Sequence, residues 1–546
     1  SANWQQQTAG ESFVSWQQNL RYASAERSRV ANGRVSWGRG QQWGALLSVT
    51  GRDYGDVVGA EVGTQRHTGY SEQSVHLRLD RAFNDHWQST VVHQQLAQDD
   101  VWRTHSTRFA EPFAGTLAGD DQVRLKDQYR DLTYLKLTGR RLAAGIDQLM
   151  VTLSRQHWDE DGDRVRADSR RTQESFDSVM HGIDVQLNRQ LARGELVTGF
   201  DYYVDRVDSK RLDFAADGSL SAVAVQGPVG DDSRLAQGGL FWQYSHFLDD
   251  RTELQLGGRY HFSTLDIGRF ADPQNGLPRS YHDRWRGWVN SVRLYRELTP
   301  GWAFWSGISQ AFRAPNVADV SRSGRSRSSE IEVAALGLEP ERFISYELGL
   351  KQASRNGSAG ITLFHTGIDD FIASTPTGRV VDGLTEVTKR NAAAGRVRGV
   401  ELSLRQRFTP AWSVSAALTW QQGELDSFDS LTSPAGSREP MSRIMPLTLS
   451  AGVRWQPRGN GWLGLALRVA DRADKLSPGD LADDQRIPPG GTPGYMLVNL
   501  SGGYRLSRNV SFTLALNNLF DEAYRNHGSG VNEPGFGVTA GLQLTW

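Results

Sequence analysis

The final stretch of the chain, Phe536–Trp546, alternates strictly between two kinds of side chain. Every even position is apolar and most odd positions carry Gly, Thr or Gln. A period of two residues predicts a β-strand with one apolar and one polar face. The sequence ends at an aromatic residue within this strand, which favours a closed barrel whose last strand pairs with its first.

Length and composition narrow the class of protein. A chain of 546 residues would usually form several soluble domains, but no stretch resembles a linker, so one large repetitive architecture is favoured. No run approaches the roughly 18 apolar residues of a membrane helix, whereas a transmembrane β-barrel needs only alternate apolar residues. The absence of cysteine excludes disulfides and thiolate chemistry. A net charge of −1 gives no reason to expect a nucleic-acid partner.

Alternation bounded by turn residues predicts strands along the whole chain, and together they make an even-numbered, all-β barrel of about 22 strands. The predicted strands are 11–22, 24–37, 43–54, 72–82, 87–101, 128–139, 143–158, 176–190, 194–206, 234–248, 251–270, 280–297, 302–311, 341–351, 358–373, 384–407, 411–423, 446–456, 462–472, 495–505, 509–519 and 535–546.

The predicted connections differ systematically in length. Tight turns such as 83–86 and 298–301 alternate with long loops such as 102–128, 159–175 and 312–341. Short periplasmic turns and long extracellular loops are typical of bacterial outer-membrane barrels, whereas β-sandwiches do not sort their loops in this way. Tryptophans beside the short turns predict an aromatic girdle at the membrane interface; they are Trp37, Trp43, Trp87, Trp302, Trp412, Trp455, Trp462 and Trp546.

Four segments carry family motifs: 310–316, 338–351, Asn391 with 396–404, and 516–524. In their order and spacing they resemble the TonB-dependent outer-membrane receptors, a family that imports iron chelates, haem, cobalamin and some glycans. The motif residues of the first and last segments are Phe312, Arg313, Ala314, Pro315, Asn518, Leu519, Phe520 and Tyr524. The ending Gly541, Leu544 and Trp546 also resembles the signal by which such barrels are recognised for assembly.

The resemblance implies more than this sequence contains. Family members carry an N-terminal plug domain and a short segment that binds TonB, whereas residues 1–10 read as a lead-in and residues 11–546 as the barrel. Ser1 opens a polar stretch, so we expect any targeting peptide to have been removed. A plug is then expected as a separate or removed polypeptide, or the protein works without one. Coupling to the TonB complex is expected only through such a plug.

The loop between Phe312 and Glu341 carries the candidate ligand-binding residues, which are Arg313, Arg322, Arg325 and Arg327. Clustered guanidinium groups on an extracellular loop are suited to an anionic ferric chelate or to lipopolysaccharide phosphates. The alternative is a solvated loop in which nearby glutamates and aspartates cancel the positive charge.

The remaining candidate sites are weaker. Asp159, Asp161 and Asp163 form a calcium candidate in a predicted loop, although the spacing is not that of an EF-hand and a solvated acidic tip is an alternative. No histidine lies between Pro315 and Leu338, where haem receptors of the family typically place one, so other iron chelates are favoured over haem. His105 and His527 lie in other loops and are expected to be solvated. No constellation predicts an enzyme or a bound cofactor.

We therefore expect a transport receptor of the bacterial outer membrane, most simply for a ferric siderophore or a similar iron chelate. A passive plug-less porin, or a structural sleeve around a partner protein, is the first alternative. A soluble repetitive β-protein such as a propeller is the second.

Overall fold

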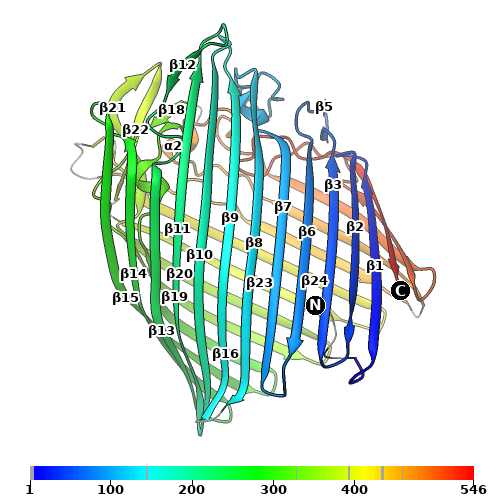
Figure 1. Cartoon of the computed structure of the whole chain (residues 1–546). Coiled ribbons are helices and arrows are strands. Elements are labelled where there is room, and N and C mark those ends of the chain that lie inside the picture. The colour runs from blue at the N-terminus through cyan, green and yellow to red at the C-terminus, as the bar shows by residue number, and fades with distance from the viewer. Residues whose placement is uncertain are drawn as a thin grey trace.

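The computed structural model describes residues 5, 7–142, 145–326, 329–391, 394–428, 430–431, 436–457 and 459–546. Twenty-two antiparallel strands form one closed barrel (Figure 1). Closure occurs where β1 (Ser12–Ala23) pairs with β30 (Gly537–Thr545), in a register that places Leu20 opposite Leu542. The terminal alternating stretch is thus a wall strand, as predicted. No helix in the described ranges is long and apolar enough to cross a membrane.

Each wall strand pairs with its neighbour in the wall. The other wall strands are β2 (Ser28–Arg39), β3 (Trp43–Tyr54), β6 (Tyr70–Ala82), β7 (Trp87–Trp102), β8 (Val123–Leu142), β9 (Ile146–Val165), β10 (Arg171–Leu191), β11 (Gly194–Phe214), β13 (Asp231–Asp249), β14 (Thr252–Ala271), β15 (Pro278–Thr299), β16 (Trp302–Arg313), β19 (Glu341–Ser354), β20 (Gly357–Asp369), β23 (Ala394–Arg407), β24 (Trp412–Asp426), β26 (Thr448–Trp455), β27 (Gly461–Ala470), β28 (Tyr495–Arg505) and β29 (Val510–Asn517).

Short elements occupy the long loops at one end of the barrel, shown at the top of Figure 1. β17 (Gly324–Arg325), β18 (Glu330–Glu332), β21 (Ile372–Val381) and β22 (Leu384–Asn391) form a separate four-stranded sheet. The other short elements are β4 (Val58–Gly59), β5 (Gly63–Thr64), β12 (Leu220–Val223), β25 (Arg438–Pro440), the 3₁₀ helix η2 (Thr104–Ser106), α1 (Val317–Ser321) and α2 (Pro478–Leu481).

Two predictions were wrong, one of a loop and one of a strand. β8 to β11 are 20 or 21 residues long, and the predicted loop 159–175 is only a turn between Val165 and Arg171. A strand that spans a bilayer needs about 9–11 residues, so these four strands continue beyond the membrane with polar side chains on both faces. The predicted strand 384–407 was also wrong, because it contains β22 of the loop sheet and β23 of the wall.

The outer face of the wall is identified by exposed apolar side chains at alternate positions. Leu363 of β20 and Leu402 of β23 are typical, with 42% and 41% of their surface exposed. The same alternation places most of the predicted tryptophan girdle outward, and Trp412 packs on Trp455 with ring centroids 6.2 Å apart. Trp462 is the exception. It alternates with the outward Leu463 and lies beneath the guanidinium of Arg454, 3.9 Å away, so it belongs to the inner face.

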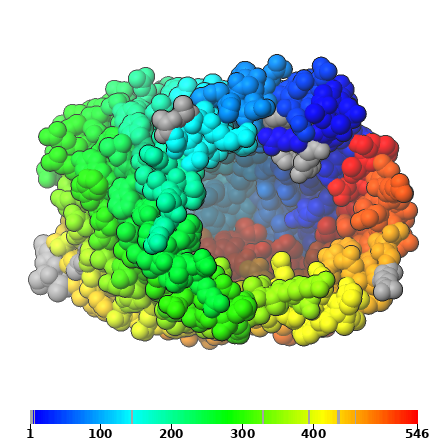
Figure 2. All heavy atoms as spheres, turned by 90° about the horizontal axis from the view of Figure 1, so that it is seen from below, coloured from blue at the N-terminus to red at the C-terminus, as the bar shows by residue number. Residues whose placement is uncertain are grey.

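The wall encloses a wide lumen. Seen from the short-turn end, the barrel is deeply hollowed at its centre (Figure 2). A barrel of this strand number is too wide for its own inward side chains to fill, whereas eight strands suffice for a filled interior.

Candidate functional site

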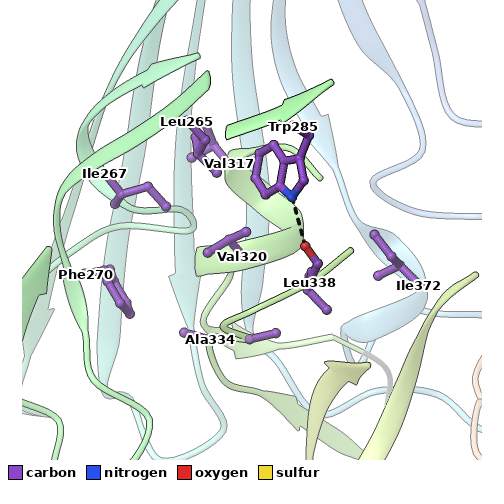
Figure 3. Close-up of a cluster of buried hydrophobic side chains, with 10 residues drawn as sticks. Leu265, Ile267, Phe270, Trp285, Val317, Val320, Ala334, Leu338 and Ile372 are labelled. Atoms are coloured by element: carbon purple, nitrogen blue, oxygen red, sulfur yellow. Dashed lines mark hydrogen bonds between the residues drawn. The ribbon is translucent and has the colours of Figure 1, made fainter. Parts of the chain in front are cut away.

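The long loop after β16 folds against the inner face of β14 and β15. Leu265 and Ile267 of β14 and Trp285 of β15 pack there against Val320 of α1 and Leu338 (Figure 3). The indole Nε1 of Trp285 donates a hydrogen bond to the carbonyl oxygen of Leu338 at 3.2 Å. Trp288, three residues further along β15, is 66% exposed and faces outward. This cluster is the largest buried apolar core in the described chain, and it holds the loop against the inner face of the wall at the long-loop end.

Arg313 joins the loop to the wall through charge. It forms ion pairs with Glu341 at the start of β19 and with Asp319 of α1, the latter at 2.6 Å. Asp319 also caps α1, because its side chain accepts from the backbone N–H of Asn316 while the side chain of Asn316 accepts from the N–H of Asp319. Lys389 of β22 reaches the same carboxylate at 3.0 Å. The motif around Pro315 therefore begins a short, tightly capped helix.

The four predicted arginines do not form one open cluster. Arg313 is engaged by two carboxylates, whereas Arg322 and Arg325 line a cavity of about 490 Å³. Arg322 approaches Glu332, behind the lining, at 3.5 Å, and Arg325 approaches Asp120, in the lining, at 4.0 Å. Arg327 lies outside the described residues.

The lining of the cavity is rich in arginine. It lies between the mouth-end segments of β8 to β11 and the loop after α1. Leu135 and Leu153 face outward, and Arg124 and Arg164 occupy the alternate positions of the same strands, so these two arginines face the lumen. Its charged lining comprises the cations Arg103, Arg124, Lys126, Arg164, Arg166, Arg170, Arg211, Arg322 and Arg325 and the anions Asp120, Asp163, Asp168, Glu174 and Asp382. In the lining itself, cations outnumber carboxylates by nine to five. Carboxylates behind the lining form ion pairs with several of these cations: Asp121 with Arg124 and Arg164, Glu160 with Lys126, Asp213 with Arg211, and Glu332 with Arg322. Arg103 and Arg166 have no ion pair among the described residues. Such a surplus in a partly enclosed site favours an anionic ligand.

Burial and nearby cations shift the pKa values of two groups beside the cavity. Burial, together with Arg486 and Arg322, lowers the pKa of Arg103 below its ordinary value. Burial and the cations Arg486 and Arg103 likewise lower the pKa of His105 to about 3, so this histidine is neutral at physiological pH. Arg103 forms no ion pair with any residue that the structure describes. The expectation that His105 is simply solvated was wrong, because its side chain packs against the backbone at Gly530.

Sequence reasoning missed the arginines that the wall strands contribute. Arg124, Arg164 and Arg211 lie on strand ends that the alternation of apolar residues did not reveal, because both faces of these ends are polar above the membrane. The available signal was the density of arginine between residues 103 and 211, but only strand pairing brings these residues beside Arg322.

The calcium candidate is not a loop site. Asp159, Asp161 and Asp163 lie on β9 at alternate positions, opposite Tyr129, Asp127 and Leu125 of β8. Their parity matches that of the outward Leu153, and Asp159 and Asp161 face outward, whereas Asp163, nearest the strand end, also lines the cavity. Arg171 binds Asp163 at 2.7 Å. In the described ranges, no three His, Asp or Glu side chains converge in a way that would hold a metal ion.

The remaining motif residues organise the end of the chain. The side chain of Asn518, only 4% exposed, donates to the carbonyl of Glu522 at 2.9 Å and accepts from its N–H. Leu519 donates its backbone N–H to Val498, Phe520 is exposed, and Tyr524 packs on Tyr495 with ring centroids 4.6 Å apart. These contacts fold the loop before β30.

The predicted assembly signal lies at the seam of the barrel. Trp546 packs on Trp16 of β1 with centroids 4.4 Å apart, and the two residues exchange backbone hydrogen bonds. Gly541 accommodates Thr513, because a Cβ at Gly541 would lie 2.6 Å from the Thr513 hydroxyl oxygen. Leu544 has the outward parity of Leu542.

Sequence relatives include an outer-membrane protein and a siderophore receptor. The chain is 25% identical over 321 residues to the iron-regulated outer membrane virulence protein of Vibrio cholerae serotype O1, covering 55% of this chain and 47% of that protein. It is 25% identical over 241 residues to the catecholate siderophore receptor Fiu of Escherichia coli K12, covering 44% and 29%. The chain therefore spans half or less of the length of these relatives.

Solved structures share the fold. The copper transporter OprC superposes with a TM-score of 0.80 at 16% identity, over 99% of this chain and 84% of that one. The ferric-catecholate import receptor Fiu of E. coli K12 superposes with a TM-score of 0.70 at 14% identity, over 99% and 82%. The model of the family described as "TonB dependent receptor-like, beta-barrel" matches residues 15–519. With its closed barrel of 22 strands, this chain belongs to that family of outer-membrane receptors.

Proposed function

We propose that the protein is the barrel of an uptake receptor for an anionic iron chelate, such as a ferric siderophore, and that the chelate binds in the basic cavity. The observation that carries this proposal is the surplus of cations in the lining of a cavity of about 490 Å³ at the mouth, where Arg103 and Arg166 have no ion pair among the described residues. Wall strands and the loop that bears Arg322 and Arg325 form this cavity jointly. Relatives named as siderophore receptors support an iron chelate as the ligand class.

Transport requires that the ligand pass through the lumen of the barrel and that the lumen be closed at other times. A plug, whether joined to this chain in a longer precursor or supplied separately, would close the lumen and couple it to TonB. A passive porin is the competing function, and it is favoured only by the width of the lumen (Figure 2).

The test compares chelates that differ in charge. The full chain, in detergent, is titrated with an anionic ferric catecholate and with a neutral ferric hydroxamate of similar size. We expect tighter binding of the anionic chelate, weakening as salt rises. The variant Arg103→Ser/Arg322→Ser should weaken that binding at least tenfold, whereas Arg355→Ser/Arg508→Ser, at exposed positions in turns at the opposite end, should not. Equal affinity of both variants for the anionic chelate would overturn the proposal.

A further inference from the structure

A second group of arginines lies on the outside of the barrel, where no ligand in the lumen reaches it. We infer that Arg284, Arg286, Arg342 and Arg398, here called the outer arginine patch, bind the phosphate groups of the glycolipid of the outer leaflet, lipopolysaccharide. This proposal does not depend on the proposed iron chelate or on a plug.

Strand parity establishes that the patch faces outward. In β15, Arg284 and Arg286 alternate with the buried Trp285 and share the parity of Trp288, which is 66% exposed. In β19, Arg342 has the parity of the exposed Ile344 and Tyr346. All three arginines are exposed.

Arg398 of β23 extends the patch. It has the parity of the exposed Leu402 and is itself exposed. It lies in register with His365 of β20 and Gln422 of β24, whose side-chain oxygen accepts its hydrogen bond at 3.2 Å.

The patch lies at the height of the upper membrane boundary. β15 begins at the long-loop end and reaches the short turn at Thr299. At about 3.4 Å per residue and a tilt of 35–45°, Trp288 lies roughly 25–30 Å above that turn, which matches an apolar band of about 25 Å. Arg286 follows two residues further out. Its guanidinium therefore lies where acyl chains give way to polar groups, and where Trp288 and Tyr260, with ring centroids 5.0 Å apart, form the aromatic border.

The cations of the patch are largely uncompensated. Arg284, Arg286 and Arg342 form no ion pair within the part of the chain that the structure describes. The carboxylate of Asp266 is held by His282 at 2.5 Å and by Arg234 at 3.7 Å, and Glu424 is held by Arg396 at 2.5 Å. Among the described outward residues of β15, β16, β19, β20 and β23, Asp369, in register with Arg342, is the one carboxylate.

Another part of the wall, β8 to β10, carries the opposite charge on its outer face. There the outward residues of β8 to β10 include Asp127, Asp159, Asp161 and Asp177. Burial and the charges of Asp161 and Asp177 raise the pKa of Asp159, whose strand segment extends beyond the membrane. A phosphorylated lipid should therefore bind on one side of the barrel only. Guanidinium groups suit this ligand because they donate paired hydrogen bonds to phosphate oxygens.

The experiment measures lipid retained by the full chain. Wild type, the patch variant (Arg284→Ser, Arg286→Ser, Arg342→Ser and Arg398→Ser) and a control (Arg193→Ser, Arg251→Ser, Arg355→Ser and Arg508→Ser) are purified from the same outer membranes. The control removes four exposed arginines from short turns and so matches the change in charge. Bound lipopolysaccharide is counted by native mass spectrometry. We expect at least a fivefold loss in the patch variant and less than a twofold change in the control.

A second measurement uses the wild type alone and so does not depend on how a variant folds. Delipidated protein is titrated with phosphorylated glycolipid and with the same glycolipid after enzymatic dephosphorylation. We expect at least tenfold weaker binding of the dephosphorylated form, and weakening of the phosphorylated form by salt. Equal binding of the two lipids, or equal retention of lipid by a patch variant that shows heat-modifiable gel mobility, would overturn the inference.

Discussion

Arg313 and Asp319 form an ion pair 2.6 Å long that connects the last residue of a wall strand to the helix of the mouth loop. The same guanidinium binds Glu341, whose side chain is only 4% exposed, at the start of the next wall strand. One motif arginine thus fixes both ends of the loop that carries Arg322 and Arg325. This pairing makes Arg313 a positioning residue for the proposed ligand site rather than an open anion contact.

Replacing Arg313 should loosen the loop without unfolding the barrel. Arg313→Ala leaves two largely buried carboxylates short of a partner. Breaking a fully buried pair costs about 3–5 kcal/mol, and we expect a smaller cost here because the Arg313 side chain is 40% exposed and Lys389 still pairs with Asp319. We expect much faster amide hydrogen exchange in residues 316–326 and 329–340, with unchanged heat-modifiable mobility. Arg342→Ala, an exposed arginine without an ion pair among the described residues, is the matched control. Unchanged exchange in Arg313→Ala would show that the apolar cluster around Trp285 holds the loop alone.

The same network predicts a dependence on pH. Burial raises the pKa of Asp319, but Lys389 and the hydrogen bond from Arg313 outweigh it, so its pKa lies below the ordinary value of 3.8. A lowered native pKa contributes stability above the unfolded-state pKa, and that contribution is lost as pH falls through the native pKa. Proteolysis of the loop by pepsin should therefore accelerate below about pH 4.

The variant Asp319→Asn isolates this effect from other titrating groups. It should be cleaved faster than the wild type at pH 5, and its cleavage should change less between pH 5 and pH 3. An identical pH profile in the two proteins would assign the dependence to other carboxylates.

Orientation of the terminal strand can be tested by adjacent substitutions. Leu542→Arg places a charge on the lipid-facing side, which costs about 2–4 kcal/mol near the midplane. Gln543→Arg places the same charge on the lumen side, where water or a plug solvates it. We expect reduced outer-membrane levels only for Leu542→Arg, measured by heat-modifiable gel mobility and quantitative immunoblotting. The reverse order of the two variants would contradict the outward face assigned here.

The barrel seam should depend on aromatic packing. Trp546→Ala removes the contact with Trp16 at the junction of the first and last strands. Large apolar truncations cost about 3–5 kcal/mol when fully buried, and because Trp546 is 54% exposed we expect a smaller loss here. Assembly should slow, as measured by the rate at which the folded form appears in detergent. Trp412→Ala, in a pair away from the seam, should assemble at the wild-type rate.

The width of the lumen predicts an electrical property. The 546-residue chain in a planar bilayer should conduct as a large, weakly selective pore, because inward groups such as Glu347 and Lys351 are satisfied by water as well as by a polar plug. A polypeptide that fills the lumen should lower the conductance. A folded, inserted barrel that stays silent on its own would show that the mouth loops close it, and would weaken the proposal of a plug-gated receptor.

The sequence alone determined the barrel fold. Each strand that crosses the membrane must place apolar side chains toward lipid at every second position, and this alternation can be read in each strand separately. Leu542 and Leu544, or Tyr346 and Leu348, alternate with small or polar neighbours whatever their partners are, so strand number and the order of turns and loops were readable. The alternation of apolar residues did not identify the strand segments that extend beyond the membrane. Above the membrane both faces of a strand are polar, and the ends of β8 to β11, with Asp159 among them, were therefore predicted as loops.

Only the tertiary structure decided the chemistry of the mouth and of the outer wall. Arg103, Arg164 and Arg322 are distant in sequence and meet because strand register and the packing of Val320 on Leu265 place them around one cavity. Arg313, by contrast, has its guanidinium group occupied by ion pairs with Asp319 and Glu341. A match to the family motif does not reveal these ion pairs. The interaction between two charges depends on their distance in space and not on their separation in sequence. The local alternation of apolar residues therefore identifies the strands of the wall, but not the charged side chains that meet at the ends of those strands.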